Sequence, residues 1–325
     1  MNPAAFIAAL SIAATLSLAA GPASAQTYPD RPLRIVVGFS AGGPTDVVSR
    51  LVGQKLTQAL GQPVVVDNRP GAGGVLAGEI VAKSPADGYT LLMGTIGGLS
   101  VSQSLQANMP YQTLRDFAPI TQVVANTNLM VLHPSVPVRS VKEFIALARA
   151  QPGRLNYASS GNGTVTHLSG ELFKNMAQVQ ITHVPYKGGG PALNALLSGE
   201  VDLSFENALV VLPHVKSGRL RALAVTGAKR AAALPEVPTM SEAGLRGYEA
   251  TGWYGLLAPA ATPSEIVRRL HDETVRILRT QEMIDKLRAQ GSEAVGSSPE
   301  QFAAFIRAES EKWARVVKTS GMRLD

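Results

Sequence analysis

The chain of 325 residues contains no cysteine. That absence excludes disulfide bonds, thiol catalysis and metal sites built on thiolate ligands. Charged residues are scarce at 17% and aromatic residues at 5%, whereas 45% of the chain is hydrophobic. This composition is typical of a globular protein, and the length suits about two domains with their own hydrophobic cores.

The basic residues are too scattered to form a polyanion-binding surface. The net charge is +6, but nothing is denser than the pairs Lys229-Arg230 and Arg268-Arg269, and no basic run is interleaved with aromatic residues. Nucleic-acid binding is therefore not expected. The positive charge would at most raise the encounter rate with small anions.

No Lys or Arg precedes Arg31, so the N-terminus lacks a basic segment. Residues 1–25 are nonetheless almost wholly apolar or small, and they end in Ala23-Ser24-Ala25, a signal-peptidase pattern. The apolar part is shorter than the ~20 residues of a membrane span, and no later stretch is long and apolar enough for one. We predict a signal peptide over 1–25, cleavage after Ala25, and export of the chain from Gln26 onward to the periplasm.

Residues 35–60 contain a strand, a glycine turn and a helix in succession. Residues 35–37 are a β-branched run typical of a buried strand, and Gly38 to Gly43 form the turn. Pro44 suits the first position of the helix, and apolar residues then repeat at helical spacing to Leu60. In a parallel α/β sheet the exposed N–H groups and the dipole of such a helix attract an anion.

The same turn allows a second interpretation. Gly38-Phe39-Ser40-Ala41-Gly42 matches the G-x-S-x-G nucleophile elbow of α/β-hydrolases. Against this, only about a dozen mature residues precede the strand, too few for the strands that normally come before an elbow. None of the histidines at 133, 167, 183, 214 and 271 is placed by a recognisable motif. We favour an anion cradle and keep a serine hydrolase using Ser40 as the alternative.

Strand and helix patterns alternate through the rest of the chain, which predicts an α/β protein with a doubly wound parallel sheet. A second junction repeats the first: a strand over 155–158 leads through Ser159-Ser160-Gly161-Asn162-Gly163-Thr164 into a helix over 165–177. The other predicted strands are 63–66, 90–93, 129–132, 201–206, 220–226 and 251–257. The other predicted helices are 75–83, 141–151, 192–198, 266–279, 282–290 and 299–318.

Several of these segments, taken together and in order, resemble the Bug family, the TctC-like periplasmic receptors of tripartite tricarboxylate transporters. The resemblance covers essentially the whole chain, and the family usually has proline where this chain has Ser40. The matching segments are Tyr28-Pro-Asp-Arg-Pro-Leu-Arg34, Phe39-Ser-Ala-Gly-Gly-Pro-Thr-Asp46, Val66-Asp-Asn-Arg-Pro-Gly-Ala-Gly-Gly74, Ser84-Pro-Ala-Asp-Gly-Tyr-Thr90, Tyr157-Ala-Ser-Ser-Gly-Asn-Gly-Thr164, His183-Val-Pro-Tyr-Lys-Gly-Gly189 and Leu234-Pro-Glu-Val-Pro-Thr239.

The resemblance implies a two-lobed periplasmic-binding-protein fold of type II, a Venus flytrap in which each lobe is a mostly parallel sheet flanked by helices. Lobe 1 would comprise 26–128 plus 255–325, and lobe 2 would comprise 129–254. Residues 129–132 and 251–257 would be the hinge crossings.

The function that the resemblance implies is binding without catalysis. The protein would capture a small carboxylate between its lobes and deliver it to the membrane subunits of a tripartite tricarboxylate transporter. No cofactor, metal or nucleic acid is implied, and we expect a monomer. An orphan sensory receptor that reports the carboxylate to a membrane signalling protein is a further alternative.

The ligand would lie between the two strand–turn–helix junctions, since two helix N-termini can hold an anion without an arginine. The expected binding residues are Phe39, Ser40, Ala41, Gly43, Thr45, Asp46, Thr95, Ser159, Ser160, Gly161, Asn162, Gly163, Thr164, Lys187 and Asn207. Asp46 would brace its loop or meet a ligand amine, and Lys187 would meet a carboxylate or face solvent.

Three further side-chain features favour structural roles over ligand contact. His167 and Glu171, four residues apart, are expected to be a surface pair and not metal ligands. Trp253 and Trp313 are expected to pack in the core or hinge.

Overall fold

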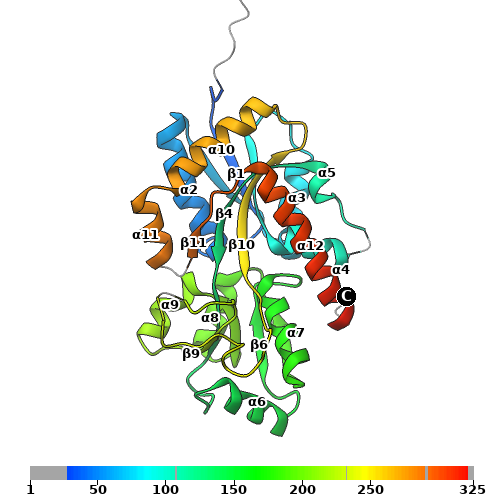
Figure 1. Ribbon diagram of the computed structural model, residues 1–325, viewed down its shortest axis with the longest axis vertical. Helices are drawn as coiled ribbons and strands as arrows, with labels where there is room; N and C mark the ends of the chain where they lie inside the picture. The colour runs from blue at the N-terminus through cyan, green and yellow to red at the C-terminus, as the bar shows by residue number, and fades with distance from the viewer. Residues whose placement is uncertain (1–27, 107, 232, 290–291, 321–325) are drawn as a thin grey trace, which may run out of the picture. The chain divides into compact units, whose positions relative to one another are not determined.

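Two mixed β-sheets organise the residues from Arg31 onward, which form one unit (Figure 1). The computed structural model describes residues 28–106, 108–231, 233–289 and 292–320. The predicted signal peptide lies outside the described residues.

The first sheet has six strands in the order β11-β4-β10-β3-β1-β2. Strand β1 pairs in parallel with β2 and β3, whereas β10 is antiparallel to β3 and β4, and β11 is antiparallel to β4. Its strands are β1 (Leu33–Val37), β2 (Val64–Asn68), β3 (Thr90–Thr95), β4 (Phe117–Asn126), β10 (Gly252–Pro259) and β11 (Ser292–Ala294). Its sequence-neighbouring helices are α2 (Pro44–Leu60), η1 (Ala72–Gly74), α3 (Val75–Ala82), η2 (Gly97–Val101), α4 (Ser102–Leu105), α5 (Thr113–Asp116), α10 (Ser264–Leu278), α11 (Gln281–Ala289) and α12 (Pro299–Ser320).

The second sheet has five strands in the order β7-β6-β8-β5-β9. Strand β6 pairs in parallel with β7 and β8, whereas β5 is antiparallel to β8 and β9. Its strands are β5 (Asn128–Leu132), β6 (Asn156–Ser159), β7 (Thr182–Pro185), β8 (Leu203–Asn207) and β9 (Arg221–Val225). The helices that follow these strands are α6 (Val141–Ala150), α7 (Val165–Ala177), α8 (Gly189–Ser198) and α9 (Ala208–Lys216).

The expected two-lobed α/β architecture is confirmed, but the sheets are mixed and not mostly parallel. In each lobe the parallel pairs come from local βα units. Strands β4, β5, β9 and β10, which pair antiparallel, adjoin the places where the chain passes between lobes, whereas the antiparallel β11 does not. One passage is at Thr127, between β4 and β5, and the other lies between β9 and β10. The predicted hinge segments 129–132 and 251–257 correspond to β5 and β10, each of which pairs within one sheet, so the passages lie beside these strands.

Local sequence signals account for the helix starts nearest the cavity. Gly43, extended at φ −78° and ψ 168°, precedes Pro44 at the first turn of α2, as predicted. The hydroxyl of Thr164 accepts a hydrogen bond from the backbone N–H of His167 and so caps α7. Helix α8 begins at Gly189, three residues before the predicted start at Ala192.

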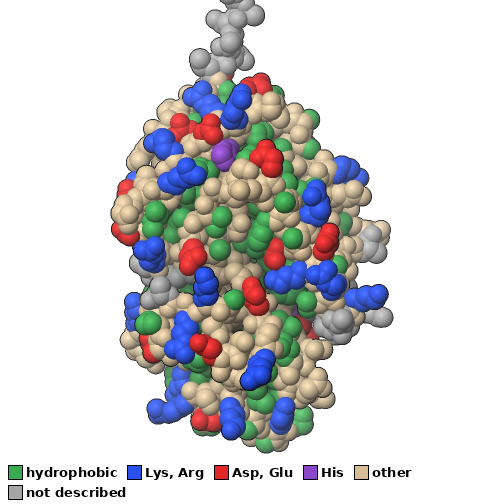
Figure 2. Space-filling model, in the orientation of Figure 1, with side chains coloured by type: hydrophobic (Ala, Val, Ile, Leu, Met, Phe, Trp, Pro, Cys, Tyr) green, Lys and Arg blue, Asp and Glu red, His purple; other side chains and the backbone are tan. Residues whose placement is uncertain are grey.

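Charge and hydropathy on the surface agree with the sequence analysis. Figure 2 shows Lys and Arg interspersed with Asp and Glu on the visible face, over both lobes. Among the helices that the structure describes, none combines the length and apolarity needed to cross a bilayer.

Candidate functional site: a cavity between the two lobes

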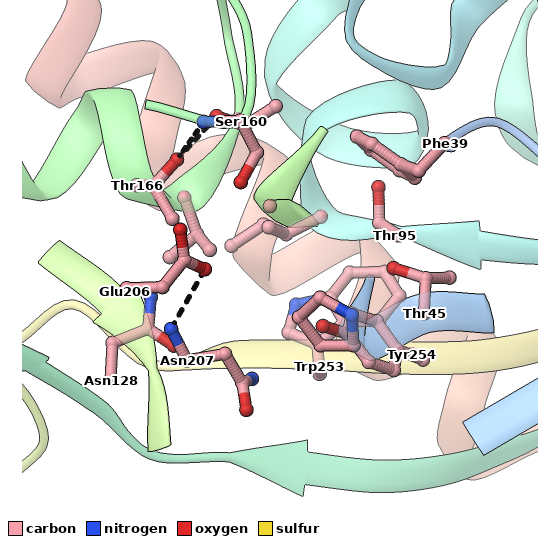
Figure 3. Close-up of a pocket in the computed structure, with 15 residues that line it drawn as sticks. Phe39, Thr45, Thr95, Asn128, Ser160, Thr166, Glu206, Asn207, Trp253 and Tyr254 are labelled. Atoms are coloured by element: carbon pink, nitrogen blue, oxygen red, sulfur yellow. Dashed lines mark hydrogen bonds between the residues drawn. The ribbon is translucent and has the colours of Figure 1, made fainter. Parts of the chain in front are cut away.

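A cavity lies between the sheets, close to the ends of β1, β3, β6 and β8 (Figure 3). Its volume is about 450 Å³, counting the space that opens to solvent. Lobe-1 elements contribute Phe39, Pro44, Thr45, Thr95, Ile96, Trp253 and Tyr254; lobe-2 elements contribute Asn128, Ser160, Thr164, Val165, Thr166, Gly189, Glu206 and Asn207.

Three helix N-termini reach this cavity: α2 through Pro44 and Thr45, α7 through its first residues, and α8 through Gly189. Their convergence is close, because a Cβ placed on Gly189 would lie 3.0 Å from Pro44 Cδ and 3.2 Å from Glu206 Oε1. The first N–H groups of a helix have no partner within the helix, and each terminus carries about half a positive charge. None of the 15 lining residues is Lys, Arg or His. The backbone therefore supplies the positive potential of the cavity.

Hydroxyl groups order the loop between β6 and α7. Thr166 Oγ1 accepts the Ser160 N–H at 2.8 Å and lies 2.9 Å from Thr164 Oγ1. Thr164 Oγ1 in turn donates to the Gly161 carbonyl at 2.7 Å. These bonds hold the first turn of α7 at the cavity wall and leave the Ser160 hydroxyl on the lining (Figure 3).

Asp46 braces the loop between β1 and α2 and does not line the cavity. The residue is only 3% exposed, and its carboxyl accepts hydrogen bonds from Gly42 N, Arg50 Nε and Asn68 Nδ2. Burial alone would raise the pKa of this carboxyl, but the hydrogen bonds and the Arg50 charge lower it below the usual value. Asn68 Nδ2 also donates to the Phe39 carbonyl at 3.0 Å. Of the two expected roles for Asp46, this geometry supports the brace.

A stacked pair of histidine rings, of which His167 is buried and His183 half-buried, supports the second loop from behind. His167 Nδ1 accepts the Gly163 N–H at 3.1 Å, and its ring stacks on His183 with 4.1 Å between centroids. His183 Nε2 lies 2.6 Å from the hydroxyl of the buried Ser159. Burial lowers the pKa of His167 and takes the pKa of His183 down to about 3, so both rings are neutral near pH 7.

The expected surface pair of His167 and Glu171 is therefore wrong. His167 is buried, and its Nε2 lies 4.0 Å from Glu171 Oε1, which also accepts hydrogen bonds from Tyr157 and Lys174. Helical spacing brought the two residues together, but α7 turns this face toward β6 and not toward solvent. Within the described residues no group of three or more potential metal ligands occurs.

Two polar side chains in the cavity have unpaired oxygens. Glu206 is 1% exposed, and its Oε1 accepts the Asn207 N–H at 2.9 Å, whereas Oε2 has no hydrogen-bond partner among the described residues. Asn128 Nδ2 donates to the Phe205 carbonyl, and its Oδ1 is likewise unpaired within the described residues. Burial raises the pKa of Glu206 to about 7. Unpaired buried oxygens on a cavity wall favour a ligand with polar groups.

An apolar wall faces these polar groups. Trp253 is 1% exposed; its indole N–H donates to Glu309 Oε2 at 3.2 Å, and its ring packs edge-on against Phe302 and Phe305. The expectation that Trp253 packs in the interior is thus met, yet the same ring also lines the cavity. With Phe39 and Ile96 it can cover the carbon skeleton of a ligand.

The lobes touch each other around the cavity. Ser40 Oγ on lobe 1 donates to the Lys187 carbonyl on lobe 2 at 2.6 Å. A Cβ on Gly73 would lie 2.5 Å from the Asn162 carbonyl oxygen, and one on Gly97 would lie 3.0 Å from that of Gly163. The structure is therefore a closed arrangement in which glycine backbones meet across the gap.

A family model described as "Tripartite tricarboxylate transporter family receptor" matches residues 48–322. The chain belongs to this family. Protein BugT of Bordetella pertussis is 39% identical to the receptor over 325 residues, covering 100% of each chain.

Solved structures agree with this assignment. Rpa4515 of R. palustris with adipate is 40% identical, with a TM-score of 0.89 over 91% of the receptor and 99% of that chain. The periplasmic binding protein BugD is 33% identical, with a TM-score of 0.88 over 91% and 99% of the two chains. MatC of Rhodopseudomonas palustris with bound malate is 33% identical, with a TM-score of 0.86 over 89% and 100%.

These findings show a periplasmic-type binding protein and not an enzyme. The alternative of a serine hydrolase that uses Ser40 is therefore excluded. The geometry at Ser40 agrees, because its hydroxyl donates to a backbone carbonyl. The serine–histidine hydrogen bond found at this junction involves Ser159, whose side chain is buried.

The expected binding residues divide into three groups. Phe39, Thr45, Thr95, Ser160, Thr164 and Asn207 line the cavity. Gly161, Asn162 and Lys187 line a neighbouring hollow of about 580 Å³, and the Lys187 side chain is exposed there. Neither the cavity nor the hollow is lined by Ser40, Ala41, Gly43, Asp46, Ser159 or Gly163, although these residues belong to the loops that build the wall. The ligand contacts of all of them stay predictions.

The sequence analysis missed Pro44, Ile96, Asn128, Val165, Thr166, Gly189, Glu206, Trp253 and Tyr254. Pro44 and Thr166 could have been found, since they adjoin predicted loop residues. Gly189 was missed because the helix was predicted to begin only at Ala192. Glu206 could have been noticed as an acid directly before the expected binding residue Asn207, at the end of its strand.

Proposed function

We propose that the receptor captures a small carboxylate in this cavity and delivers it to the membrane subunits of a tripartite tricarboxylate transporter. The observation that carries the proposal is the convergence of three helix N-termini on a cavity without a basic side chain. Backbone N–H groups and hydroxyls from both lobes would hold the carboxylate, and the aromatic wall would cover its carbon chain. The adipate and malate in the related structures support this ligand class.

Lobe closure would transmit the binding event. The expected bounds, 26–128 plus 255–325 for lobe 1 and 129–254 for lobe 2, would shift by a few residues so that β5 stays with lobe 2 and β10 with lobe 1, with movement at the two passages between them. A ligand that contacts both lobes favours the closed state by its difference in affinity for the two states. A transporter subunit could then distinguish loaded from empty receptor. The receptor would work in the periplasm as a monomer that begins at Gln26.

The test is a thermal-shift and calorimetric screen of the chain from Gln26 onward against mono-, di- and tricarboxylates, aromatic acids and amino acids. A ligand at 100 times its dissociation constant should add about 2.7 kcal/mol to the free energy of unfolding. Ser160→Ala, which removes a cavity hydroxyl, should weaken binding, whereas Ser217→Ala on the exposed surface should not.

Two results would contradict the proposal. One is a panel in which no carboxylate shifts the melting temperature. The other is equal binding by the Ser160→Ala variant and the wild type, which would put the ligand elsewhere.

A further inference from the structure

Glu206 is the one acidic residue among the 15 that line the cavity, and no basic residue accompanies it there. It lies at the end of β8, where Figure 3 shows its carboxyl directed into the cavity between Ser160 and the Trp253–Tyr254 segment. A carboxylate in this position would sit beside the negative charge of a bound anion. Like charges within a few ångströms disfavour ionisation of both groups.

The hydrogen bonds of Glu206 are asymmetric. Oε1 accepts the Asn207 N–H at 2.9 Å, while the equally buried Oε2 has no partner among the described residues. A buried ionised carboxylate normally collects several donors, because its charge is costly without them. A neutral carboxylic acid fits the observed pattern, with Oε1 as the carbonyl-type acceptor and Oε2 as the hydroxyl that donates.

We propose that Glu206 binds the ligand as a neutral acid, with the Oε2 hydroxyl donating a hydrogen bond to a carboxylate oxygen of the ligand, so that each bound ligand retains one proton on the receptor. This inference rests on the proposed function, namely that the ligand is a carboxylate. It makes Glu206 a determinant of specificity: the cavity would accept anions and would pair poorly with a ligand ammonium group.

None of the groups around Glu206 changes its protonation near pH 7, so Glu206 is the group that titrates there. Burial raises the pKa of Tyr254, on β10, far above the physiological range, and Tyr254 also bonds with Thr45 on α2. From α8 and the β6–α7 loop the neighbours are Gly189 and Ser160, which carry no charge. The histidines behind that loop, on α7 and β7, have lowered pKa values and stay neutral. Burial raises the pKa of Glu206 itself to about 7, so the proton is present in mildly acidic solution and lost in mildly alkaline solution.

Calorimetry with adipate, or with the tightest carboxylate of the screen, tests the proposal at about pH 6 and about pH 8. If only the protonated form binds, linkage predicts an affinity about tenfold weaker at the higher pH for a group with a pKa of about 7. Repeating the titration at the higher pH in buffers with different ionisation enthalpies should reveal an uptake of about one proton per ligand bound.

The decisive variant is Glu206→Gln. Its amide oxygen can accept the Asn207 N–H and its NH₂ group can donate to the ligand, which imitates the neutral acid. We expect affinity close to that of the wild type at about pH 6 and no fall at about pH 8. Glu200→Gln, which removes an exposed acid of the same lobe, should keep the pH dependence of the wild type.

Three outcomes separate the possibilities. Wild-type affinity that does not change with pH would overturn the role of Glu206 while leaving the receptor function intact. A Glu206→Gln variant that melts normally but binds at least tenfold more weakly at both pH values would show that the ionised acid is needed, as for a ligand amine. Absence of binding by every carboxylate at either pH would instead refute the proposed function.

Discussion

Substitution of Gly73 by alanine should weaken ligand binding by blocking closure of the lobes. Gly73 lies in η1 on lobe 1 with φ 64° and ψ 21°, and a Cβ there would be 2.5 Å from the Asn162 carbonyl oxygen on lobe 2. Real contacts of this kind are not shorter than 3.0 Å, so the two backbones must separate by about 0.5 Å. In the open state the same methyl group would meet no such obstacle.

The size of the effect follows from the contacts that join the lobes. A separation of about 0.5 Å would stretch the Ser40–Lys187 hydrogen bond from 2.6 Å and loosen any ligand contact that spans both lobes. Losing one or two hydrogen bonds costs roughly 1–3 kcal/mol. The dissociation constant should therefore rise about 5- to 150-fold.

The matched control is Gly61→Ala. Gly61 ends α2 with φ 72° and ψ 8°, and a Cβ there would meet nothing within 4 Å. Both substitutions place alanine in the left-handed region, at a cost of about 1–2 kcal/mol to folding. Calorimetry and melting curves should show similar destabilisation of the two variants and weaker binding in Gly73→Ala alone. Equal affinities would refute the idea that closure brings these backbones together.

Three further predictions concern single side chains. Because the pKa of Glu206 is raised to about 7, its contribution to stability is present below about pH 4.5 and is lost as pH rises through 7. At about pH 8 the Glu206→Gln variant should therefore have a higher melting temperature than the wild type, with a free energy of unfolding larger by up to roughly 3 kcal/mol. A lower melting temperature would contradict this. Because the pKa of His183 is lowered to about 3, the free energy of unfolding should fall as pH falls from about 6.5 toward 3. In denaturant titrations the His183→Gln variant should lose less stability over this pH range than the wild type. An equal loss in both would exclude His183 as its cause. Ser40→Ala removes one hydrogen bond between the lobes, worth roughly 0.5–1.5 kcal/mol, so calorimetry should show about two- to tenfold weaker binding, whereas an unchanged dissociation constant would argue against that contact.

Local signals in the sequence were sufficient for the two junctions that build the cavity. The strand, turn and helix around Pro44 and the helix from Val165 to Ala177 lie where they were predicted. Proline at a helix start, a capping threonine and apolar residues at helical spacing act over a few residues, so they can be read without knowing the fold. The family resemblance then supplied the two-lobed architecture that joins them.

The missed elements depend on partners far away in the chain. Strand β4 contains Pro119 and the polar residues Thr121 and Gln122, and it is held by pairing with β10, more than a hundred residues later. Its antiparallel partners make the sheet mixed. The alternation of predicted strands and helices along the sequence does not reveal such pairing. Similarly, α8 begins early at Gly189, where it meets Pro44 of the other lobe.

The sequence by itself determined the secondary structure of the binding loops and the class of receptor. Only the tertiary structure decided which side chains face the ligand. Glu206, Asn128 and Trp253 come from strands of two different sheets and share one cavity because the lobes meet there. Glu206 is buried and has an unpaired oxygen because the two lobes enclose it, and not because of its neighbours along the chain. These two features are the reason that we expect it to bind as a neutral acid.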